Sequence, residues 1–310
     1  MTWTPDPDAF VRDLEAKPAT LREVAPMIAE DPWQAADQRD RIVCIGMGSS
    51  RFAALPICGA LRAAGRDVIV ERASAARATP PGPGTLAIGI SASGSTPETV
   101  AALARHRAGG SATVAVTNTS GSALESAADH HIALQAGDEA GGVACRTFQH
   151  TIAVLLALLD PARAAAAVRR AADATEDLLE RRSTWLPEAL DMLGDGPVFT
   201  VAPEERISSA EQGALMLREG PRVQADACET GDWLHVDVYL TKPLEYRALL
   251  FAGSRFDAGV VRWVVERDGR MVRIGPGGIG YAGDDDEDVA LLTETLVPEL
   301  VAAHVWRRQA

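Results

Sequence analysis

The chain has few lysines, few aromatic residues and no long apolar run. Lysine occurs only as Lys17 and Lys242, and aromatic residues make up 5% of the 310 residues. The longest apolar run, residues 152–159, is far shorter than the roughly 20 residues that a membrane-spanning helix needs. The formal charge is −13, from 30 basic and 43 acidic residues. We therefore expect neither a membrane nor a nucleic acid as a partner, since both bind proteins through basic surfaces.

Cysteines and export signals are also scarce. Four cysteines, Cys44, Cys58, Cys145 and Cys228, are scattered without the spacing of metal ligands. The first six residues contain neither the basic segment nor the apolar stretch of a signal peptide. We therefore expect free thiols in a cytoplasmic protein. No pattern in the sequence points to a metal or another cofactor, and we expect none.

Short apolar strands alternate with helical stretches in both halves of the chain. The strands expected from the sequence cover residues 41–46, 67–70, 85–90, 112–116, 131–134, 198–201, 246–252 and 271–274. The helices expected between and after them cover residues 51–64, 96–107, 122–128, 147–182, 208–219, 258–266 and 289–306, and the long region 147–182 is expected to break near Asp160-Pro161. This alternation predicts an α/β fold, in which each half is a parallel sheet with helices on both faces.

The same pattern divides the chain into four segments. Residues 1–32 read as N-terminal helices interrupted at Pro18, because proline breaks a helix interior. Residues 33–160 form the first expected subdomain and residues 195–310 the second. Helices in residues 161–194 link them.

Two loops of the first half carry hydroxyl groups where a strand leads into a helix. Gly46-Met47-Gly48-Ser49-Ser50 follows the first expected strand, and Ser91-Ala92-Ser93-Gly94-Ser95-Thr96 follows the third. Ligands of open parallel sheets bind beyond the carboxyl ends of the strands. A helix N-terminus offers free N–H groups and positive partial charge to an anion, and the hydroxyls add neutral donors. Together the two loops predict a cradle for a phosphate group.

Other interpretations of these loops stay open. The serines could serve only as helix caps, a role that favours Ser and Thr. A dinucleotide site is a weaker alternative, because Arg51 stands where its fingerprint needs a third glycine, although Glu71 ends the second strand. The acidic run at residues 284–288 could bind a cation or form a solvated loop that favours the following helix.

In this combination the sequence resembles the SIS (sugar isomerase) family, in particular the isomerase part of glucosamine-6-phosphate synthase and related deglycases and deaminases. The loop at residues 91–96 is similar to the family's Ser-Gln-Ser-Gly-Glu-Thr. Further similar segments are residues 13–18, 48–50, 142–144, 212–219 and 231–235. The resemblance implies two flavodoxin-like SIS subdomains and covers nearly the whole chain.

The resemblance also assigns roles to particular residues. In the family both hydroxyl-rich loops grip the sugar phosphate, which implies phosphate contacts from Ser50, Ser91, Ser93 and Thr96, with Ser49 nearby. The second half implies two catalytic residues. Glu219 would move a proton between C1 and C2 of the sugar, and His235 would assist ring opening.

The sequence supports Glu219 independently. Gly220-Pro221 follows it directly and ends the helix, so the carboxylate lies at a helix C-terminus. The negative end of the helix dipole disfavours the ionised form and predicts a raised pKa. A raised carboxyl pKa suits a general base that works near neutral pH. The alternative is an ordinary surface glutamate at a frayed helix end.

Several departures from the family pattern count against ordinary isomerisation. Gln212 and Met216 stand on the same helix face as Glu219, where the synthase pattern carries Glu and Lys. Residues 202–205 replace an expected Gly-Arg-Gly, and the last residues, 305–310, contain no lysine. Schiff-base chemistry with a lysine is therefore not expected.

Three hypotheses follow. The first is an enzyme, an aldose–ketose isomerase, deaminase or deglycase that acts at C1–C2 of an amino- or glycated-sugar phosphate. The second is a non-catalytic sugar-phosphate sensor that keeps the cradle. The third is an unrelated α/β enzyme on the same fold, since a fold does not fix a function. By resemblance we also expect a homodimer, in which His235 could reach the neighbouring subunit's site.

Overall fold

The computed structural model describes residues 6–36 and 39–310. Residues 1–5, for which the sequence predicts no signal peptide, lie outside the described part. The chain forms two compact units, each built from more than one segment of sequence. One comprises residues 20–138 and 146–168, and the other comprises the described residues up to 19 together with 139–145 and 169–310. The four consecutive segments predicted above stay a prediction.

The unit of residues 20–138 and 146–168 is built on a five-stranded parallel sheet. Its strand order is β2-β1-β3-β4-β5, the flavodoxin-like order. The strands are β1 (Arg41–Gly46), β2 (Asp67–Arg72), β3 (Thr85–Ile90), β4 (Ala112–Thr117) and β5 (His130–Ala133). The predicted strands are confirmed within two residues at each end. Strand order reverses between β1 and β3, and the hydroxyl-rich loops follow these two strands.

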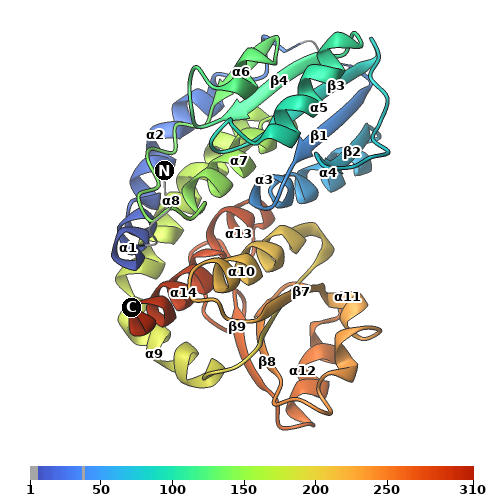
Figure 1. Cartoon of the computed structure of the whole chain (residues 1–310). Helices are drawn as coiled ribbons and strands as arrows, with labels where there is room; N and C mark the ends of the chain where they lie inside the picture. Colours follow the sequence, from blue (N-terminus) through green and yellow to red (C-terminus); the bar gives the residue numbers. More distant parts are fainter. Residues whose placement is uncertain (1–5, 37–38) are drawn as a thin grey trace. The chain divides into compact units, whose positions relative to one another are not determined.

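Helices cover both faces of this sheet, as Figure 1 shows. They are α3 (Ser49–Phe52), α4 (Ala54–Ala63), α5 (Pro97–Ala108), α6 (Ala123–Ser126) and α7 (Arg146–Leu156). Val43 and Ala87 pack with Leu103 of α5 and Leu124 of α6. Cys44, the next residue of β1, faces the opposite side of the sheet because strand side chains alternate. Its sulfur lies 3.6 Å from the sulfur of Cys58 in α4. The predicted helices on both faces are confirmed.

The other unit is built on a four-stranded parallel sheet with the order β7-β6-β8-β9. Its strands are β6 (Val198–Ala202), β7 (Ala225–Glu229), β8 (Arg247–Phe251) and β9 (Arg270–Ile274). This order repeats the pattern of the first four strands of the chain. The sequence analysis missed β7, because this edge strand carries Asp226 and Glu229 and lacks a run of apolar residues.

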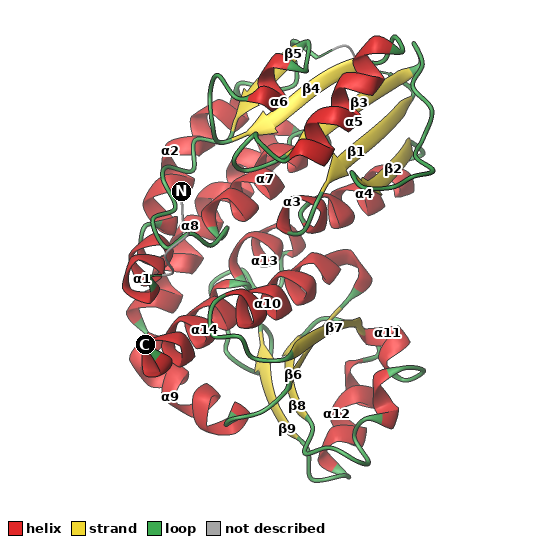
Figure 2. Ribbon diagram, viewed as in Figure 1, coloured by secondary structure: helices red, strands yellow, loops and turns green. Residues whose placement is uncertain are grey.

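Helices lie on both faces of this sheet as well (Figure 2). They are α9 (Arg182–Leu193), α10 (Ile207–Glu219), α11 (Thr230–Trp233), α12 (Asp257–Val265), α13 (Glu287–Thr293) and α14 (Leu296–Gln309). The short 3-10 helices are η1 (Glu204–Arg206) and η2 (Asp237–Tyr239). Trp233 and Val260 belong to the core on one face. On the other face, Thr200 Oγ1 donates 2.8 Å to the Ala210 carbonyl of α10.

Three further helices complete the chain. These are α1 (Pro7–Glu15), α2 (Lys17–Ala29) and α8 (Pro161–Glu180). The predicted interruptions at Pro18 and near Asp160-Pro161 are confirmed within one or two residues. The single helix predicted for residues 289–306 is instead two helices, α13 and α14. Residues 287–309 are long and apolar enough to cross a membrane, but 89% of the apolar window is buried inside the protein, as is typical of a core helix.

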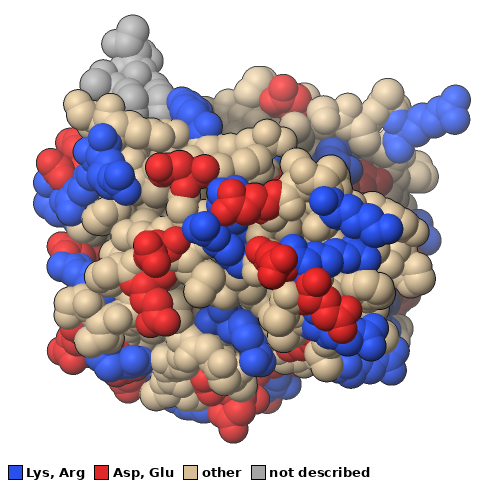
Figure 3. Space-filling view, turned by 90° about the horizontal axis from the view of Figure 1, so that it is seen from below, with Lys and Arg blue, Asp and Glu red and all other residues tan. Residues whose placement is uncertain are grey.

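One prediction from composition also has an outcome in the structure. All four cysteines are free, as expected, and all four are buried. On the face in Figure 3, Lys and Arg side chains alternate with Asp and Glu side chains.

Candidate functional site

The loop at residues 91–96 is tied to neighbouring elements by its backbone. The N–H of Ser91 donates 3.1 Å to the Val116 carbonyl of β4, and the N–H of Leu124 in α6 donates 2.9 Å to the Gly94 carbonyl. Gly94 has φ +62°, and a Cβ there would lie 2.3 Å from Ser122 Oγ. Only glycine therefore fits this position without displacement. The loop is held in one shape from both sides.

The hydroxyls of this loop are paired with one another. Ser91 Oγ lies 2.9 Å from Thr96 Oγ1, and Ser93 Oγ lies 2.8 Å from Ser95 Oγ. Thr96 is the N-cap residue of α5, yet its side chain caps no N–H of that helix. The Thr96 side chain therefore does not act as a helix cap. The first N–H groups of α5 have no side-chain cap and keep the capacity to bind an anion.

The loop after β1 has a similar arrangement. Gly48, with φ +50°, is the N-cap of α3 and offers no side chain to it. Ser49 and Ser50 begin this helix and are half-buried. Because β1 and β3 are adjacent and parallel, both loops leave the same edge of the sheet. The structure thus places all five predicted phosphate-binding residues at the carboxyl edge of one sheet.

The interpretation of the first loop as a dinucleotide site requires Glu71 to be available to a ribose, and in the structure this carboxylate has other partners. Glu71, which would contact a ribose, accepts hydrogen bonds from the backbone N–H of Thr79, at 2.6 Å, and from its hydroxyl. The carboxylate therefore serves a turn of the chain itself. The acidic run is likewise structural in part, since Asp286 caps α13 through the N–H groups of Asp288 and Val289.

Glu219, in the other unit, ends α10 as predicted. Burial raises the pKa of this carboxyl, Arg222 opposes the rise and the negative charge of Glu139 adds to it. The predicted direction is confirmed, but burial is the leading cause, whereas the sequence argument relied on the helix dipole. The half-buried carboxyl suits proton transfer near neutral pH.

The segment Glu139–Cys145 lies in the same unit as Glu219. Asp13 Oδ2 accepts 2.7 Å from the N–H of Gly141, and Glu139 Oε1 accepts 2.7 Å from the N–H of Cys145. Gln212 Nε2 donates 2.8 Å to the Ala144 carbonyl. Three side chains therefore fix the segment that contains Gly142-Val143-Ala144. The sequence singled out this motif but did not show which side chains anchor it.

His235 is exposed in the turn after α11, where its N–H donates 2.8 Å to the Asp232 carbonyl. The residues around it are pinned more firmly. Trp233 Nε1 donates 2.7 Å to the Tyr246 hydroxyl, which in turn donates 3.3 Å to Asp237 Oδ2. This buried relay fixes the backbone on either side of His235. Within the described part of the chain, no hydrogen bond joins His235 to Glu219.

Comparison with known proteins agrees with this architecture. Residues 36–160 match the family described as SIS domain. A glutamine–fructose-6-phosphate aminotransferase (isomerizing) of Zymomonas mobilis is 30% identical over 92% of this chain and 50% of its own length. Residues 36–160 are therefore similar to the SIS domain family. The chain spans about half the length of the curated relatives it matches first.

Solved structures show the same SIS fold. The C-terminal domain of glucosamine-fructose-6-phosphate aminotransferase from Francisella tularensis has a TM-score of 0.85 at 16% identity, covering 99% of this chain and 97% of the other. Glucosamine-6-phosphate deaminase from Thermotoga maritima has a TM-score of 0.79 at 16% identity, covering 97% and 95%. The predicted pair of flavodoxin-like SIS subdomains is confirmed.

Proposed function

We propose that this SIS chain binds a sugar phosphate through Ser49, Ser50, Ser91, Ser93 and Thr96. The observation that carries the proposal is the start of α5, where paired hydroxyls adjoin N–H groups that no side chain caps. No carboxylate stands inside either loop. Neutral donors of this kind hold a phosphate dianion locally, despite the net charge of −13.

The reaction is proton transfer between C1 and C2 of an amino- or glycated-sugar phosphate, as an isomerase, deaminase or deglycase. Glu219 is the base: its carboxylate removes the proton from one carbon and returns it to the neighbouring carbon, while the carbonyl oxygen gains a proton and the hydroxyl or amino group on the neighbouring carbon loses one. His235 assists ring opening. The names of two similar proteins support this reaction class, since the Zymomonas relative is named for fructose 6-phosphate and the Thermotoga structure for glucosamine 6-phosphate.

The second candidate is a non-catalytic sugar-phosphate sensor. Gln212 and Met216 favour it, because they replace two ionisable groups of the synthase pattern with an amide and a thioether. Both side chains are buried, and their Nε2 and Sδ atoms lie 3.5 Å apart. A sensor would keep the cradle and tolerate these changes.

A panel of amino-sugar and glycated-sugar 6-phosphates separates the two candidates. Binding is measured by calorimetry and turnover by release of product, in the unchanged protein and in Glu219→Gln. We expect turnover that falls at least a hundredfold in this variant while binding persists. Glu266→Gln is the matched control, since Glu266 also ends a helix but is exposed. Binding without turnover of any substrate would favour the sensor, and equal turnover by Glu219→Gln would exclude Glu219 as the base.

We further propose a homodimer that buries the surface around His235. Val236 and Tyr239, beside this residue, are 52% and 67% exposed, which is unusual for large apolar side chains on a free surface. Light scattering at working concentration should give twice the chain mass, and Val236→Asp with Tyr239→Asp should shift it toward the single-chain mass. A monomer before any substitution contradicts the dimer.

A further inference from the structure

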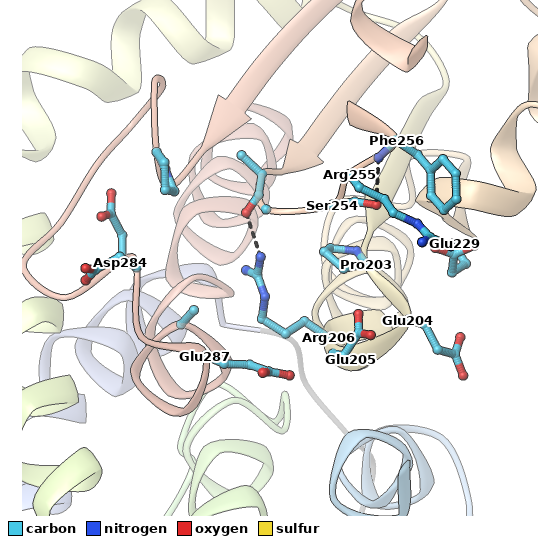
Figure 4. A pocket seen from close by; sticks show the side chains of 15 residues that line it. Pro203, Glu204, Glu205, Arg206, Glu229, Ser254, Arg255, Phe256, Asp284 and Glu287 are labelled. Atoms are coloured by element: carbon cyan, nitrogen blue, oxygen red, sulfur yellow. Dashed lines mark hydrogen bonds between the residues drawn. The ribbon is translucent and has the colours of Figure 1, made fainter. Parts of the chain in front are cut away.

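A cavity of about 900 Å³ opens at the carboxyl edge of the four-stranded sheet. Figure 4 shows its walls, formed by the loops that follow β6, β8 and β9 and by the start of α13. Pockets of roughly 300–1,000 Å³ are the size that holds small molecules. The cavity lies entirely within one unit and includes neither Glu219 nor His235.

The position of the cavity repeats that of the cradle. Strand order in the four-stranded sheet reverses between β6 and β8, as it does between β1 and β3 in the other sheet. Open parallel sheets bind ligands at this reversal, beyond the carboxyl ends of the strands. Residues 203–206 after β6 and 252–256 after β8 therefore occupy the places that the hydroxyl-rich loops occupy in the first half.

The chemistry of the two places is opposite. Six carboxylates and two arginines line the cavity. Arg206 is buried and already has partners, since its guanidinium pairs with Glu294 and donates 2.6 Å to the Ala252 carbonyl. Arg255 lies over the ring of Phe256, 4.7 Å from its centroid. The remaining field is negative and disfavours a phosphate.

The backbone donors that would hold an anion are also used internally. The N–H of Gly253 donates 2.7 Å to Asp257 Oδ2, and the N–H of Phe256 donates 3.2 Å to Ser254 Oγ. In the cradle, by contrast, no carboxylate stands within the loop. An anion in the second cavity would have to displace Asp257 from Gly253.

One polar group beside the cavity lacks a partner. Tyr281 is only 6% exposed, and its hydroxyl makes no hydrogen bond. The charges of Glu294, Arg206 and Asp284 all act on it, so it lies close to two residues of the cavity wall. A buried hydroxyl without a partner is unfavourable, and a ligand that hydrogen-bonds to it would remove that cost.

We propose that this cavity is a second binding site, which takes a small organic ammonium compound of sugar size that carries hydroxyl groups. The carboxylates of Glu204, Glu205 and Glu229 attract the ammonium group, and Glu229 does so while one of its oxygens accepts 2.7 Å from the N–H of Asp232. A bare metal ion fits less well, because the described residues contain no group of three side chains placed to hold one. The cavity volume also far exceeds that of an ion.

Calorimetric titration with free glucosamine, which has an ammonium group and no phosphate, tests the site. We expect binding that weakens at least tenfold in Glu204→Gln with Glu205→Gln, both of which are exposed, at an unchanged unfolding midpoint. The matched control is Glu23→Gln with Glu30→Gln, two exposed glutamates outside the cavity. N-acetylglucosamine has the same ring without the charge and should bind at least tenfold more weakly.

Further titrations distinguish this cavity from the phosphate cradle and test its preference for glucosamine. Ser91→Ala with Ser93→Ala should leave glucosamine binding unchanged, so failure of the cradle proposal does not affect the result. Tyr281→Phe should weaken binding severalfold without lowering the unfolding midpoint. Spermidine and Mg²⁺, tested alone, should bind more weakly than glucosamine. The proposal is overturned if glucosamine does not bind at millimolar concentration, if N-acetylglucosamine or Mg²⁺ binds equally well, or if the Glu204 and Glu205 variant keeps full affinity.

Discussion

The side-chain amide of Gln212 donates a hydrogen bond of 2.8 Å to the backbone carbonyl of Ala144. Both residues are in the same unit, and the bond joins α10 to the segment Glu139–Cys145. Gln212 is fully buried, so water does not compete for its donor. A glutamate, which the synthase pattern carries at this position, has no donor when ionised. Glutamine in place of glutamate at position 212 therefore allows the hydrogen bond that holds the backbone at Ala144.

Replacing Gln212 by Glu should destabilise the protein strongly near neutral pH. An ionised carboxylate would face a carbonyl oxygen in a buried place, and we expect a loss of roughly 2–4 kcal/mol in the free energy of unfolding. The loss should shrink as the pH falls, because the protonated acid can donate to Ala144. Urea denaturation at pH 8 and pH 5 measures both effects.

Gln34→Glu provides the control for this substitution. Gln34 is exposed and bonds the Glu30 carbonyl at 3.4 Å, so the same chemical change should cost less than about 0.5 kcal/mol. Equal stability of Gln212→Glu and Gln34→Glu would show that the bond to Ala144 does not hold the segment.

The sheets were predictable from the sequence because their strands are short apolar runs. Strand β3 is buried at every residue, and its predicted bounds agree with the structure. Strand β7 escaped prediction, because Asp226 and Glu229 interrupt its apolar pattern. The split between α13 and α14 was also missed, since residues 293–295 contain neither the glycine nor the proline that marks a helix end.

The position of the hydroxyl-rich loops at the sheet edge was predictable from the sequence, but the contacts that support the candidate site were not. Hydroxyl and glycine positions beside a strand end mark Ser91 and Gly94 without any long-range information. The anchors of the Gly142-Val143-Ala144 motif come from residues as distant as Asp13 and Gln212. Hydrogen bonds between residues so far apart in the sequence form only in the folded chain, and no local sequence pattern predicts them.

Gly94→Ala should damage the cradle more than a positive φ alone explains. A left-handed backbone costs a non-glycine residue about 1–2 kcal/mol, and the new Cβ would also lie 2.3 Å from Ser122 Oγ. Gly121→Ala is the control, because Gly121 has φ +71° with nothing within 4 Å of its Cβ position. We expect Gly94→Ala to lose about 1–3 kcal/mol more stability than the control. If urea denaturation gave similar losses of stability for Gly94→Ala and Gly121→Ala, contact with Ser122 would not be the reason that position 94 requires glycine.

The pH dependence of turnover should follow the charges around Glu219. A general base works only when ionised, so kcat/KM should rise with pH through a pKa above the ordinary carboxyl value of about 4.3. Arg222→Gln should move this rise to higher pH, since Arg222 lowers the pKa of Glu219.

Glu139→Gln should move the same rise to lower pH, since Glu139 raises that pKa and glutamine keeps an oxygen for the N–H of Cys145. Shifts in the same direction for the Arg222 and Glu139 variants would exclude Glu219 as the titrating group.

The buried ion pair of Lys17 and Glu299 offers a test that needs no substrate. Both side chains are fully buried, and Lys17 Nζ contacts Glu299 Oε2. Lys17→Met alone leaves Glu299 without its cation, so the buried carboxyl must either stay charged and unpaired or take up a proton at pH 7. We expect this to cost roughly 3–5 kcal/mol, whereas Lys17→Met with Glu299→Leu should recover most of that loss. The double-mutant cycle is measured by urea denaturation at pH 7. Equal losses in the single and double variants would mean that packing, and not the charge, sets the cost.

The same pair predicts how stability depends on pH. Burial raises the pKa of Glu299 to about 7, against the opposing effect of Lys17. In the unfolded chain the carboxyl titrates near 4.3. Between these values the folded state holds a proton that the unfolded state has lost, so the contribution of Glu299 to stability falls as the pH rises from about 4.3 to about 7. Lys17→Met with Glu299→Leu lacks the titrating group and should therefore lose less stability across this window than the unchanged protein. If the free energy of unfolding changed with pH equally in the double variant and in the unchanged protein, a group other than Glu299 would take up the proton.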